Sequence, residues 1–597
     1  AHASQPGPLE PIPAEPPSMT DSSGYRMYVF RSGRRDVPGP RLVAELADDL
    51  RALAAPAGAD RDRGIVLRAL IRAGELESIL ADAGAASAPL LARLTDELAA
   101  MLVGGAGALA IPDGPTSDHG RPDLWPRAAS RLTTPEALAA LAAIDVPAMV
   151  PTSPPEGFSF YALHPLDFAR LAEQLASSPA PVRVVGIRSI GTTLSAVTAA
   201  ALRWRGIRAG RITARPSGHP YDRRVELGVR ELAWVEDGIA EGAQFWVADE
   251  GPGFSGSSFL STGDALVGAG VPRGNIVFLG SRAADPDALV APDGARRWRS
   301  FRAERVVGGK HVPTDAGEFI GAGTWRRRFY DDESRWPPSW TSMERFKSLS
   351  RDGSRILKFE GMGRYGAECL ERARGVARAG FGPAPRDEGE GFLSYRWLPG
   401  RPLEPGHLST AVLERLADYC AFRASAFPVP SPTTDELITM ARTNFSADMG
   451  NELPAELHLE IARPVLVDGK MDPHEWLGSA SGELFKVDAA GHGDDHFLPG
   501  PTDIAWDLAG AIVEWRMAPE ARRAFLDRYR RRSGDDPERR LPAYLLAYAL
   551  LRLGYAAMAA ASLPDEDEAR RLAAARHRYR SALLGRLAPA ASRGALG

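Results

Sequence analysis

Residues 145–285 alternate between apolar runs and amphipathic stretches. Four runs predict β-strands: "VRVVGI" at 182–187, "RAGRITAR" at 208–215, "QFWVADE" at 244–250 and "NIVFLGS" at 275–281. "LSAVTAAALRWRG" at 194–206 and "SSFLSTGDALVGAG" at 257–270 predict helices between them. This order is typical of a parallel sheet with helices on both faces. Ligands bind such sheets at the carboxyl ends of their strands.

Residues 19–120 show the helical period instead. "LVAELADDLRALAA" at 42–55 and "LLARLTDELAAMLVG" at 90–104 carry apolar residues three and four positions apart, and the segment 61–84 has the same spacing. We expect a helical N-terminal region here, serving as an accessory or dimerisation unit. Residues 1–18 are rich in proline and lack a basic segment followed by an apolar one, so we interpret them as a disordered tail rather than a signal peptide.

Beyond the sheet pattern, residues 286–345 are rich in Arg, Trp and Gly and predict a connector with partial structure of its own. Residues 346–590 predict a further unit, which ends in Ala/Leu/Arg-rich helices from 516 onward. The fold class that we expect is therefore α/β for 145–285 and α+β for 346–590, with helices ahead of both.

Bulk composition narrows the class of protein. The chain has 597 residues, 44% of them hydrophobic and 25% charged, with a formal net charge of −4. This balance indicates neither a nucleic-acid nor a membrane partner, and we find no apolar run of about 18 residues. The two cysteines, Cys369 and Cys420, cannot build a disulfide framework, which fits a reducing cytoplasm. A small-molecule substrate is the partner that we expect, and the sequence leaves the oligomeric state open.

The first candidate site follows the strand "QFWVADE". Asp249 and Glu250 stand at its end, and two adjacent carboxylates, which only accept hydrogen bonds when ionised, suit a diol or a metal cluster. The Gly/Ser loop that follows opens a helix and offers backbone N–H groups and hydroxyls, as phosphate sites do. A diol beside a phosphate is the chemistry of a ribose 5-phosphate. The loop residues are Ser255, Gly256, Ser257 and Ser258.

"FWVADEGPGFSGSSF" resembles the PRPP-binding motif of type I phosphoribosyltransferases, in a divergent branch similar to those of tellurite-resistance-type operons. The resemblance implies that Asp249 and Glu250 hold the ribose hydroxyls and that the serine loop holds the 5-phosphate. It also implies PRPP as co-substrate, Mg²⁺, and displacement of pyrophosphate at the anomeric carbon. The loop differs from the family pattern at Pro252 and at an added Gly-Phe.

Two further segments complete this resemblance. "VVGIRSIGTTLS" occupies the place of the family's pyrophosphate loop, and "ARPSGHPYDRRV" at 214–225 occupies the place of its mobile lid. An arginine can bind a pyrophosphate with two parallel hydrogen bonds. The residues implied are Arg188, Ser189 and Gly191 in the first segment, with Arg215 and Arg223 for binding and His219 or Asp222 for proton transfer in the second.

The acceptor is not specified by these motifs. We expect its pocket from a hood that includes "PTSPPEGFSFYALHP" at 151–165, in which four side chains can stack on a ring: Phe158, Phe160, Tyr161 and His164. Aromatic residues ahead of a sheet also serve as core. The same ribose-phosphate grip can serve hydrolysis or phosphorolysis of a nucleotide.

The second candidate site begins with Lys358 in the strand-like run "RILKFE" and continues to Asp488 at the end of "ELFKVD". This order resembles small-molecule kinases of the aminoglycoside and choline kinase type. The resemblance implies ATP at Lys358, with Glu368 or Glu371 orienting that lysine, and Mg²⁺ at Asp488. It places Asp503 and Asp507 in a structural Asp-Leu-Ala helix.

The kinase catalytic loop is where the chain departs from that family. "DGKMDPHEWL" places Lys470 at the position of the catalytic base, and a lysine is normally protonated at neutral pH. Asp472 or Asp468 can substitute as the base, with Glu475 as a metal ligand. "GHGDDH" at 491–496 offers a further metal site or a solvated turn, with candidate ligands His492, Asp494, Asp495 and His496.

Three functions remain open from the sequence. The first is a bifunctional enzyme that joins a PRPP-dependent transferase to a kinase in the biosynthesis of a nucleoside-like metabolite. The second is a transferase with a degenerate kinase-like module. The third is a regulatory protein that binds PRPP or a nucleotide without turnover.

Overall fold

The computed structural model describes residues 27, 29, 34–54, 59–105, 131–253, 255–307, 311–430, 432–453, 457–495, 497–563 and 565–587. The expected tail, 1–18, and His496 lie outside these residues. The chain forms two compact units. The larger contains residues 32–407 with 473–496, and the smaller contains 408–472 with 497–597.

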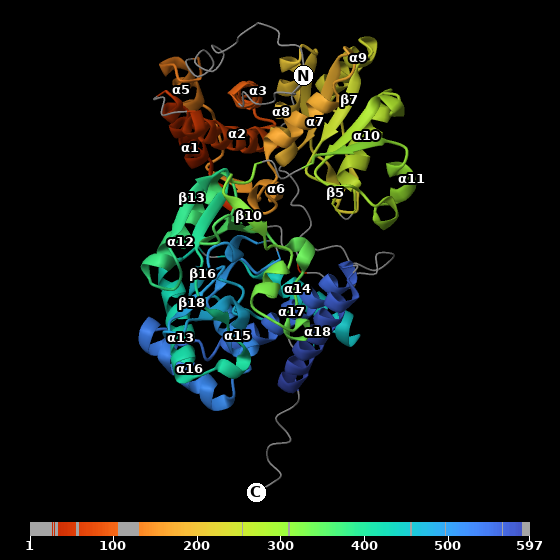
Figure 1. Cartoon of the computed structure of the whole chain (residues 1–597). Coiled ribbons are helices and arrows are strands. Elements are labelled where there is room, and N and C mark those ends of the chain that lie inside the picture. Colours follow the sequence, from red (N-terminus) through yellow and green to blue (C-terminus); the bar gives the residue numbers. More distant parts are fainter. Residues whose placement is uncertain are drawn as a thin grey trace, which may run out of the picture. The chain divides into compact units, whose positions relative to one another are not determined.

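A five-stranded parallel sheet is the first layer of the larger unit (Figure 1). All four strands predicted between 145 and 285 are confirmed. The fifth strand lies within the range that we expected to be a connector. In spatial order the strands are β4 (Ala209–Ala214), β3 (Val182–Ile187), β7 (Gln244–Ala248), β8 (Ile276–Gly280) and β9 (Arg302–Arg305).

Helices cover both faces of this sheet because successive apolar side chains along its strands point to opposite faces. Trp246 and Ala248 share a core with α8 (Ile190–Trp204), whereas Phe245 and Val247 share one with α9 (Val229–Ala240) and α10 (Ser257–Gly268). The predicted helices are confirmed, and α9 was not predicted. The core on the α8 side also includes α1 (Gly39–Leu53), α2 (Ala59–Asp82), α3 (Ala88–Gly105) and α7 (Pro165–Leu175).

The N-terminal helices therefore form a layer on the sheet, and do not have a core of their own. Short elements complete this part of the unit. They are β1 (Arg35–Pro38), α5 (Pro135–Ala142), β2 (Met149–Thr152), α6 (Glu156–Ser159), the hairpin strands β5 (Ser217–His219) and β6 (Asp222–Arg224), and α11 (Gly294–Trp298).

A second, antiparallel sheet belongs to the same unit and is flanked by α12 (Gly363–Arg378). Lys358 pairs with Leu393 in the register, and Phe359 pairs with Phe392. Both phenylalanines join the hydrophobic core of the α8 side of the first sheet, so the two sheets share one core. In spatial order the strands are β10 (Ala316–Phe319), β11 (Lys347–Ser350), β12 (Arg355–Phe359), β14 (Phe392–Arg396) and β13 (Pro385–Gly389); a small sheet adds β15 (Arg401–Pro402), β17 (Trp476–Gly478) and β18 (Leu484–Lys486).

The smaller unit is mainly helical, as predicted for the residues after 516. One helix, α17, is long and apolar enough to cross a membrane, although 67% of its most apolar window is buried inside the protein, as in a core helix. The elements are α13 (Thr410–Ala426), α14 (Asp435–Met449), β16 (Pro464–Leu466), β19 (Pro501–Asp503), α15 (Ala505–Glu514), α16 (Pro519–Ser533), α17 (Leu541–Ser562) and α18 (Glu566–Leu587).

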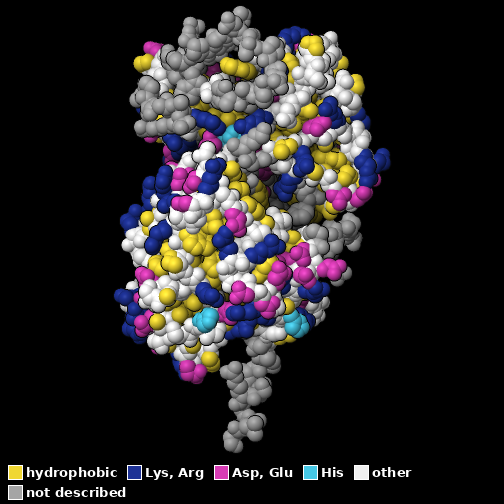
Figure 2. Space-filling model, viewed as in Figure 1, with side chains coloured by type: hydrophobic (Ala, Val, Ile, Leu, Met, Phe, Trp, Pro, Cys, Tyr) yellow, Lys and Arg dark blue, Asp and Glu magenta, His cyan; other side chains and the backbone are white. Residues whose placement is uncertain are grey.

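Charged side chains of both signs are interspersed over the face shown in Figure 2. Basic side chains do not gather there into one extended patch, which agrees with the small net charge of −4. The absence of a nucleic-acid partner stays a prediction.

Candidate functional site

The carboxyl edge of the parallel sheet brings the first set of predicted residues together. The turn after β3 packs directly on the end of β7, because a Cβ atom at Gly191 would lie 2.5 Å from the carbonyl oxygen of Ala248. Gly186 is equally close, and a Cβ there would lie 2.3 Å from the oxygen of Gly191. Gly191 therefore serves close packing. The Arg188–Ser189 peptide bond in this turn is cis.

Arg188 and Arg215 converge on one carboxylate, that of Asp82 at the end of α2. Arg188 lies 2.9 Å and the Nε of Arg215 lies 3.0 Å from Oδ1 of Asp82. Arg215 also donates a hydrogen bond of 2.9 Å to the backbone oxygen of Arg188. Asp82 and Arg215 are each more than a third exposed, so this cluster of two arginines and one carboxylate opens to solvent. Nothing in the sequence motifs pointed to Asp82.

The serine loop lies under the predicted lid. Ser255 and Ser257 donate hydrogen bonds of 3.0 and 2.6 Å to the backbone oxygen of Pro220, in the turn of the β5–β6 hairpin. Arg223 of the same hairpin donates to the hydroxyl of Ser258 at 2.8 Å. Gly256 precedes α10 with φ of 64°, the left-handed region that favours glycine. The hairpin thus contacts three of the four residues predicted for phosphate.

His219 and Asp222 lie exposed on that hairpin. The Nδ1 of His219 accepts a hydrogen bond of 3.2 Å from the backbone N–H of Tyr221, and its ring contacts the Tyr221 ring edge to face. The structure places neither residue in a buried proton-transfer arrangement. Their catalytic role stays a prediction.

The two carboxyls of the acidic pair face different neighbours. Burial raises the pKa of Asp249 to about 7, although the backbone N–H of Glu250 and the guanidinium of Arg223 act in the opposite direction. Burial also raises the pKa of Glu250 well above its usual range, and the nearby carboxyls of Glu156 and Asp249 add to the shift. The backbone N–H of Gly157, in α6, donates to the Glu250 carboxylate. Arg223 and Arg215 of the predicted lid are thus the cations that act on Asp249, whereas Glu250 contacts Gly157 of the predicted hood.

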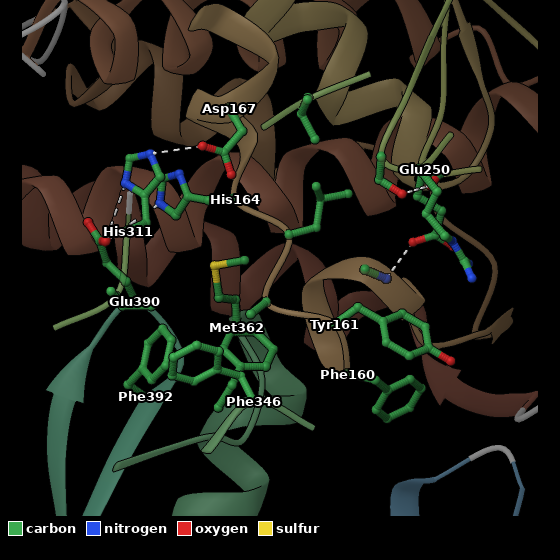
Figure 3. A pocket seen from close by; sticks show the side chains of 18 of the residues that line it. Phe160, Tyr161, His164, Asp167, Glu250, His311, Phe346, Met362, Glu390 and Phe392 are labelled. Carbon is green, nitrogen blue, oxygen red and sulfur yellow. Dashed lines mark hydrogen bonds and ion pairs between the residues drawn. The ribbon is translucent and has the colours of Figure 1, made fainter. Parts of the chain in front are cut away.

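A cavity of about 370 Å³ adjoins Glu250 (Figure 3). Three of the four residues predicted to stack on a ring line it, namely Phe160, Tyr161 and His164, whereas Phe158 is buried in the core. Its opposite wall comes from residues in and beside the second sheet. The sequence did not predict that this part of the chain lines the cavity. The residues of that wall include Phe346, Phe359, Met362, Glu390 and Phe392.

The second candidate site centres on Lys358 in β12. Its ammonium lies 2.8 Å from Glu360 and contacts Asp488, which Lys347 also approaches at 2.9 Å. Burial favours the protonated form of Asp488, but Lys347 and Lys358 together hold the pKa of that carboxyl well below its usual range. The predicted lysine and the predicted metal ligand therefore meet in one buried ion cluster.

The glutamate that pairs with Lys358 is not one of the two predicted. Glu371 is exposed and pairs with Arg374 at 2.6 Å, while Glu368 lies 3.5 Å from Arg35. Glu360 pairs with Lys358 instead, because residues two apart in an extended strand lie on the same face. This period was legible in "KFE" at 358–360.

The predicted catalytic loop is held from within the smaller unit. Asp507 of α15 accepts hydrogen bonds of 2.9 Å from the backbone N–H groups of both Asp468 and Gly469. The hydroxyl of Tyr419 donates a hydrogen bond to the carboxylate of Asp468. Asp503 accepts bonds of 2.8 and 2.6 Å from the backbone N–H groups of residues 462 and 463. These contacts support the structural role expected for both residues, although Asp503 ends β19 and only Asp507 lies in the helix, α15.

Asp472, a candidate base, is buried and pairs with Arg552 at 2.9 Å. Arg552 also lies 3.2 Å from Glu514, so its guanidinium bridges two carboxyl groups. The resemblance places Lys470 at the position of the base. The catalytic roles of Asp468, Lys470 and Asp472 stay predictions.

The remaining metal candidates are held by cations of the protein itself. Glu475 is buried and pairs with Lys486 at 2.8 Å, with His492 3.7 Å away. Asp494 contacts both Arg35 and Arg372 in a buried cluster. The guanidinium groups account for the charge of Asp494 without a metal ion.

Comparisons with known proteins do not assign a family. No protein-family model matches the chain, and no curated protein matches it. The chain is similar to solved structures, among them a choline/ethanolamine kinase family protein from Mesorhizobium loti, with 17% identity and a TM-score of 0.28 over 40% of this chain and 89% of that one. Choline kinase LicA from Streptococcus pneumoniae gives 15%, a TM-score of 0.30, and coverage of 41% and 90%.

An aminoglycoside phosphotransferase from Alicyclobacillus acidocaldarius gives 12% identity and a TM-score of 0.26, over 47% of this chain and 97% of that one. None of these three structures is a phosphoribosyltransferase. TM-scores of this size do not establish the fold or the activity, which must be argued from the residues. The chain is thus similar, over about 40% of its length, to kinases of small molecules.

Proposed function

We propose that the carboxyl edge of the parallel sheet binds PRPP and transfers its ribose 5-phosphate to, or removes it from, a small molecule. The observation that carries this proposal is the convergence of three loops. The serine loop contacts the hairpin through Pro220 and Arg223, the charges of Arg223 and Arg215 act to lower the pKa of Asp249, and Arg215 donates a hydrogen bond to the backbone oxygen of Arg188. Hydrogen-bond donors for the phosphate and for the pyrophosphate, and hydrogen-bond acceptors for the ribose hydroxyls, thus lie at one edge of the sheet.

Each group then has a defined task. The hydroxyls of Ser255 and Ser257 and the N-terminus of α10 hold the 5-phosphate. Arg188 and Arg215 bind pyrophosphate, and their charge stabilises it as it leaves. Asp249 and Glu250 accept hydrogen bonds from the ribose hydroxyls. The hairpin covers the site and excludes water from the anomeric carbon.

A Mg²⁺ ion fits this edge by the chemistry of its donors. Asp249 and Glu250 supply carboxylate oxygens, the ligands that Mg²⁺ prefers, beside the place of the pyrophosphate. When bound, the ion neutralises part of the charge on the leaving group.

The test is pyrophosphate release from PRPP, with PRPP binding measured by calorimetry. Asp249→Asn/Glu250→Gln should reduce PRPP affinity at least tenfold. Glu236→Gln/Asp237→Asn is the matched control, because it removes two adjacent exposed acids from α9. Equal PRPP affinity in the wild type and in the site variant would reject the proposal. Binding without release in any acceptor mixture would favour the sensor function over the enzyme.

The ion cluster around Lys358 supports a second function. We propose that it binds the phosphates of ATP, with Asp488 and Glu475 as the candidate Mg²⁺ ligands. The pairing of Asp472 with Arg552 favours nucleotide binding without phosphotransfer. Asp488→Asn should abolish ATP binding, and Asp352→Asn, in an exposed turn of the same sheet, should leave it unchanged. ATP hydrolysis or transfer that disappears in Asp488→Asn would show an active kinase instead.

A further inference from the structure

The cavity beside Glu250 has a polar end and an aromatic floor. Figure 3 shows His164 and His311 stacked at one end and Glu250 at the other, with Phe346 and Phe392 below. The walls come from the segment 157–164 and from the second sheet, which are more than 150 residues apart in the sequence. The cavity is therefore built by both sheets of the larger unit.

One hydrogen-bond donor at the polar end has no acceptor. The Nδ1 atom of His164 accepts a bond of 3.1 Å from the backbone N–H of Leu166. Burial lowers the pKa of His164 well below its usual range, so the ring is neutral and its proton resides on Nε2. This Nε2 is buried without a hydrogen-bond partner among the described residues, and the nearest carboxylate oxygen, on Glu390, is 3.8 Å away. A buried donor of this kind calls for an acceptor.

His164, His311 and Glu390 also have the spacing of a metal site. The tautomer argues against it, because a neutral His164 carries a proton on the atom that would have to bind the ion. Two guanidinium groups compete as well. Arg170 lies 2.8 Å from Nε2 of His311, and Arg63 lies 3.0 Å from Glu390. The arrangement suits a hydrogen-bonding ligand rather than a cation.

The aromatic floor suits a flat ring. Phe346 and Phe392 meet edge to face with their centroids 5.6 Å apart, and Phe359 meets Phe392 in the same way at 5.4 Å. Met362 adds an adaptable apolar surface. A volume of about 370 Å³ is at the lower end of the range for small-molecule sites, as a one- or two-ring compound requires.

We propose that this cavity binds a planar heteroaromatic compound with a carbonyl or carboxylate oxygen, that this oxygen accepts a hydrogen bond from Nε2 of His164, and that the compound is the acceptor. The last point rests on the proposed function. A ring nitrogen forms a bond to the anomeric carbon, the bond from that carbon to the pyrophosphate oxygen breaks, and its electron pair leaves with pyrophosphate. A ring nitrogen that carries a proton loses it to water, whereas a pyridine-type nitrogen has none to lose and becomes positively charged.

The binding test uses the full chain and a defined panel in saturation-transfer NMR. The panel pairs oxygen-bearing rings with analogues that lack the oxygen, such as hypoxanthine with purine and nicotinic acid with pyridine. We expect at least one oxygen-bearing ring to bind at least tenfold more tightly than its analogue. Phe346→Leu should weaken that binding, and Phe329→Leu, a half-buried phenylalanine stacked on Trp397 outside the cavity, should not.

Two substitutions at one position test the hydrogen bond. His164→Asn keeps an acceptor near Nδ1 for the N–H of Leu166 but removes the Nε2 donor. His164→Gln places an amide N–H near the position of Nε2. The preference for the oxygen-bearing ring should be lost in the first variant and retained in the second. A preference that is unchanged in His164→Asn, or a panel without any bound ring, would overturn the inference.

PRPP binding separates this inference from the proposed function. Ring binding in a protein that does not bind PRPP would reject the transferase and the acceptor role while supporting the cavity as a ligand site. PRPP binding that survives in Phe346→Leu, together with loss of ring binding, would support both. PRPP binding without binding of any ring would reject the inference alone.

Discussion

Asp82 is the residue whose contacts bear most directly on anion binding. It pairs with Arg188 and Arg215, the two side chains that we propose for pyrophosphate. An incoming anion must displace this carboxylate. Asp82→Asn should therefore tighten binding of inorganic pyrophosphate three- to tenfold, as measured by calorimetry at constant ionic strength.

The control removes the same charge elsewhere. Asp48→Asn affects an exposed pair with Arg51 on α1 and should leave pyrophosphate affinity unchanged. If both variants tighten binding equally, the effect is one of net charge. If Asp82→Asn weakens binding, Asp82 positions the arginines and does not compete with the ligand.

Asp249 predicts a dependence of stability on pH. Its pKa is raised from 3.8 to about 7 by burial, so the folded state holds the proton more tightly than the unfolded state. The stability that this group contributes is complete below its unfolded pKa and is lost as the pH rises through about 7. The free energy of unfolding of Asp249→Asn, relative to the wild type, should therefore increase between pH 4 and pH 8.

Chemical denaturation at several pH values measures this difference. Asp237→Asn, on the exposed face of α9, should show no such trend. A difference that is flat across this range would mean that Asp249 is ionised in the folded protein at all of these values.

At the scale of single residues, motifs indicated the candidate functional groups but not the partners that these groups have in the structure. The sequence indicated Asp249, Arg215 and Lys358 because unusual residue types stand at strand ends or in apolar runs. Asp82 was not predicted as a partner of Arg188 and Arg215 because it belongs to a helix more than 100 positions before both arginines in the sequence. A contact of that kind depends on packing between elements, which one sequence does not reveal.

Among the elements, the β5–β6 hairpin makes the clearest prediction. Two serine hydroxyls of the loop before α10 hold the backbone oxygen of Pro220. Ser255→Ala/Ser257→Ala removes both bonds, so amide hydrogen exchange of residues 217–224 should become several-fold faster. The exposed pair Ser177→Ala/Ser178→Ala is the matched control.

An unchanged exchange rate in the serine variant would show that Arg223 and the hairpin itself hold the turn. That outcome would also weaken the interpretation of the hairpin as a lid that the loop can release.

Elements with a clean period were predictable, and those without one were not. The strands β3, β4, β7 and β8 follow from their apolar runs, and the helices α8 and α10 follow from the amphipathic stretches between them. The helix α9 was missed because its segment, "VRELAWVEDGIA", carries several exposed residues and buries only Val235 and Gly238. Strand β9 was missed because "RAER" has the composition of a surface loop.

For the molecule as a whole, the shared core of the two sheets is the main finding. Arg364 of α12, the helix beside the second sheet, is buried and joins that helix to α2 and β2, 2.9 Å from Glu75 and 2.7 Å from the hydroxyl of Thr152. Arg364→Ala breaks a buried pair and should lower the free energy of unfolding of the larger unit by about 3 kcal/mol. Amides of β7 and β12 should then exchange faster together.

Arg374→Ala, on the same helix, removes only an exposed pair with Glu371 and should cost less than about 1 kcal/mol. Faster exchange in β12 alone after Arg364→Ala would show that the sheets unfold independently.

The boundaries between the parts of the chain were harder to predict from the sequence than the elements themselves. The composition shift near 286–345 predicted a boundary, yet β9 and β10 within that range belong to the two sheets. The N-terminal helices, expected as a separate unit, cover the parallel sheet. Both differences arise from contacts between segments that are distant in the sequence. Local sequence patterns do not report such contacts.

The cavity is lined by two segments that are far apart in the sequence, so they leave the ribosome at different times during synthesis. Its roof is translated early, at Gly157 to His164, and its floor is complete only once Phe392 has left the ribosome. A nascent chain that has folded the first sheet alone lacks the surface on which a ring would rest. Ring binding, as proposed for this cavity, would therefore require that both sheets have folded.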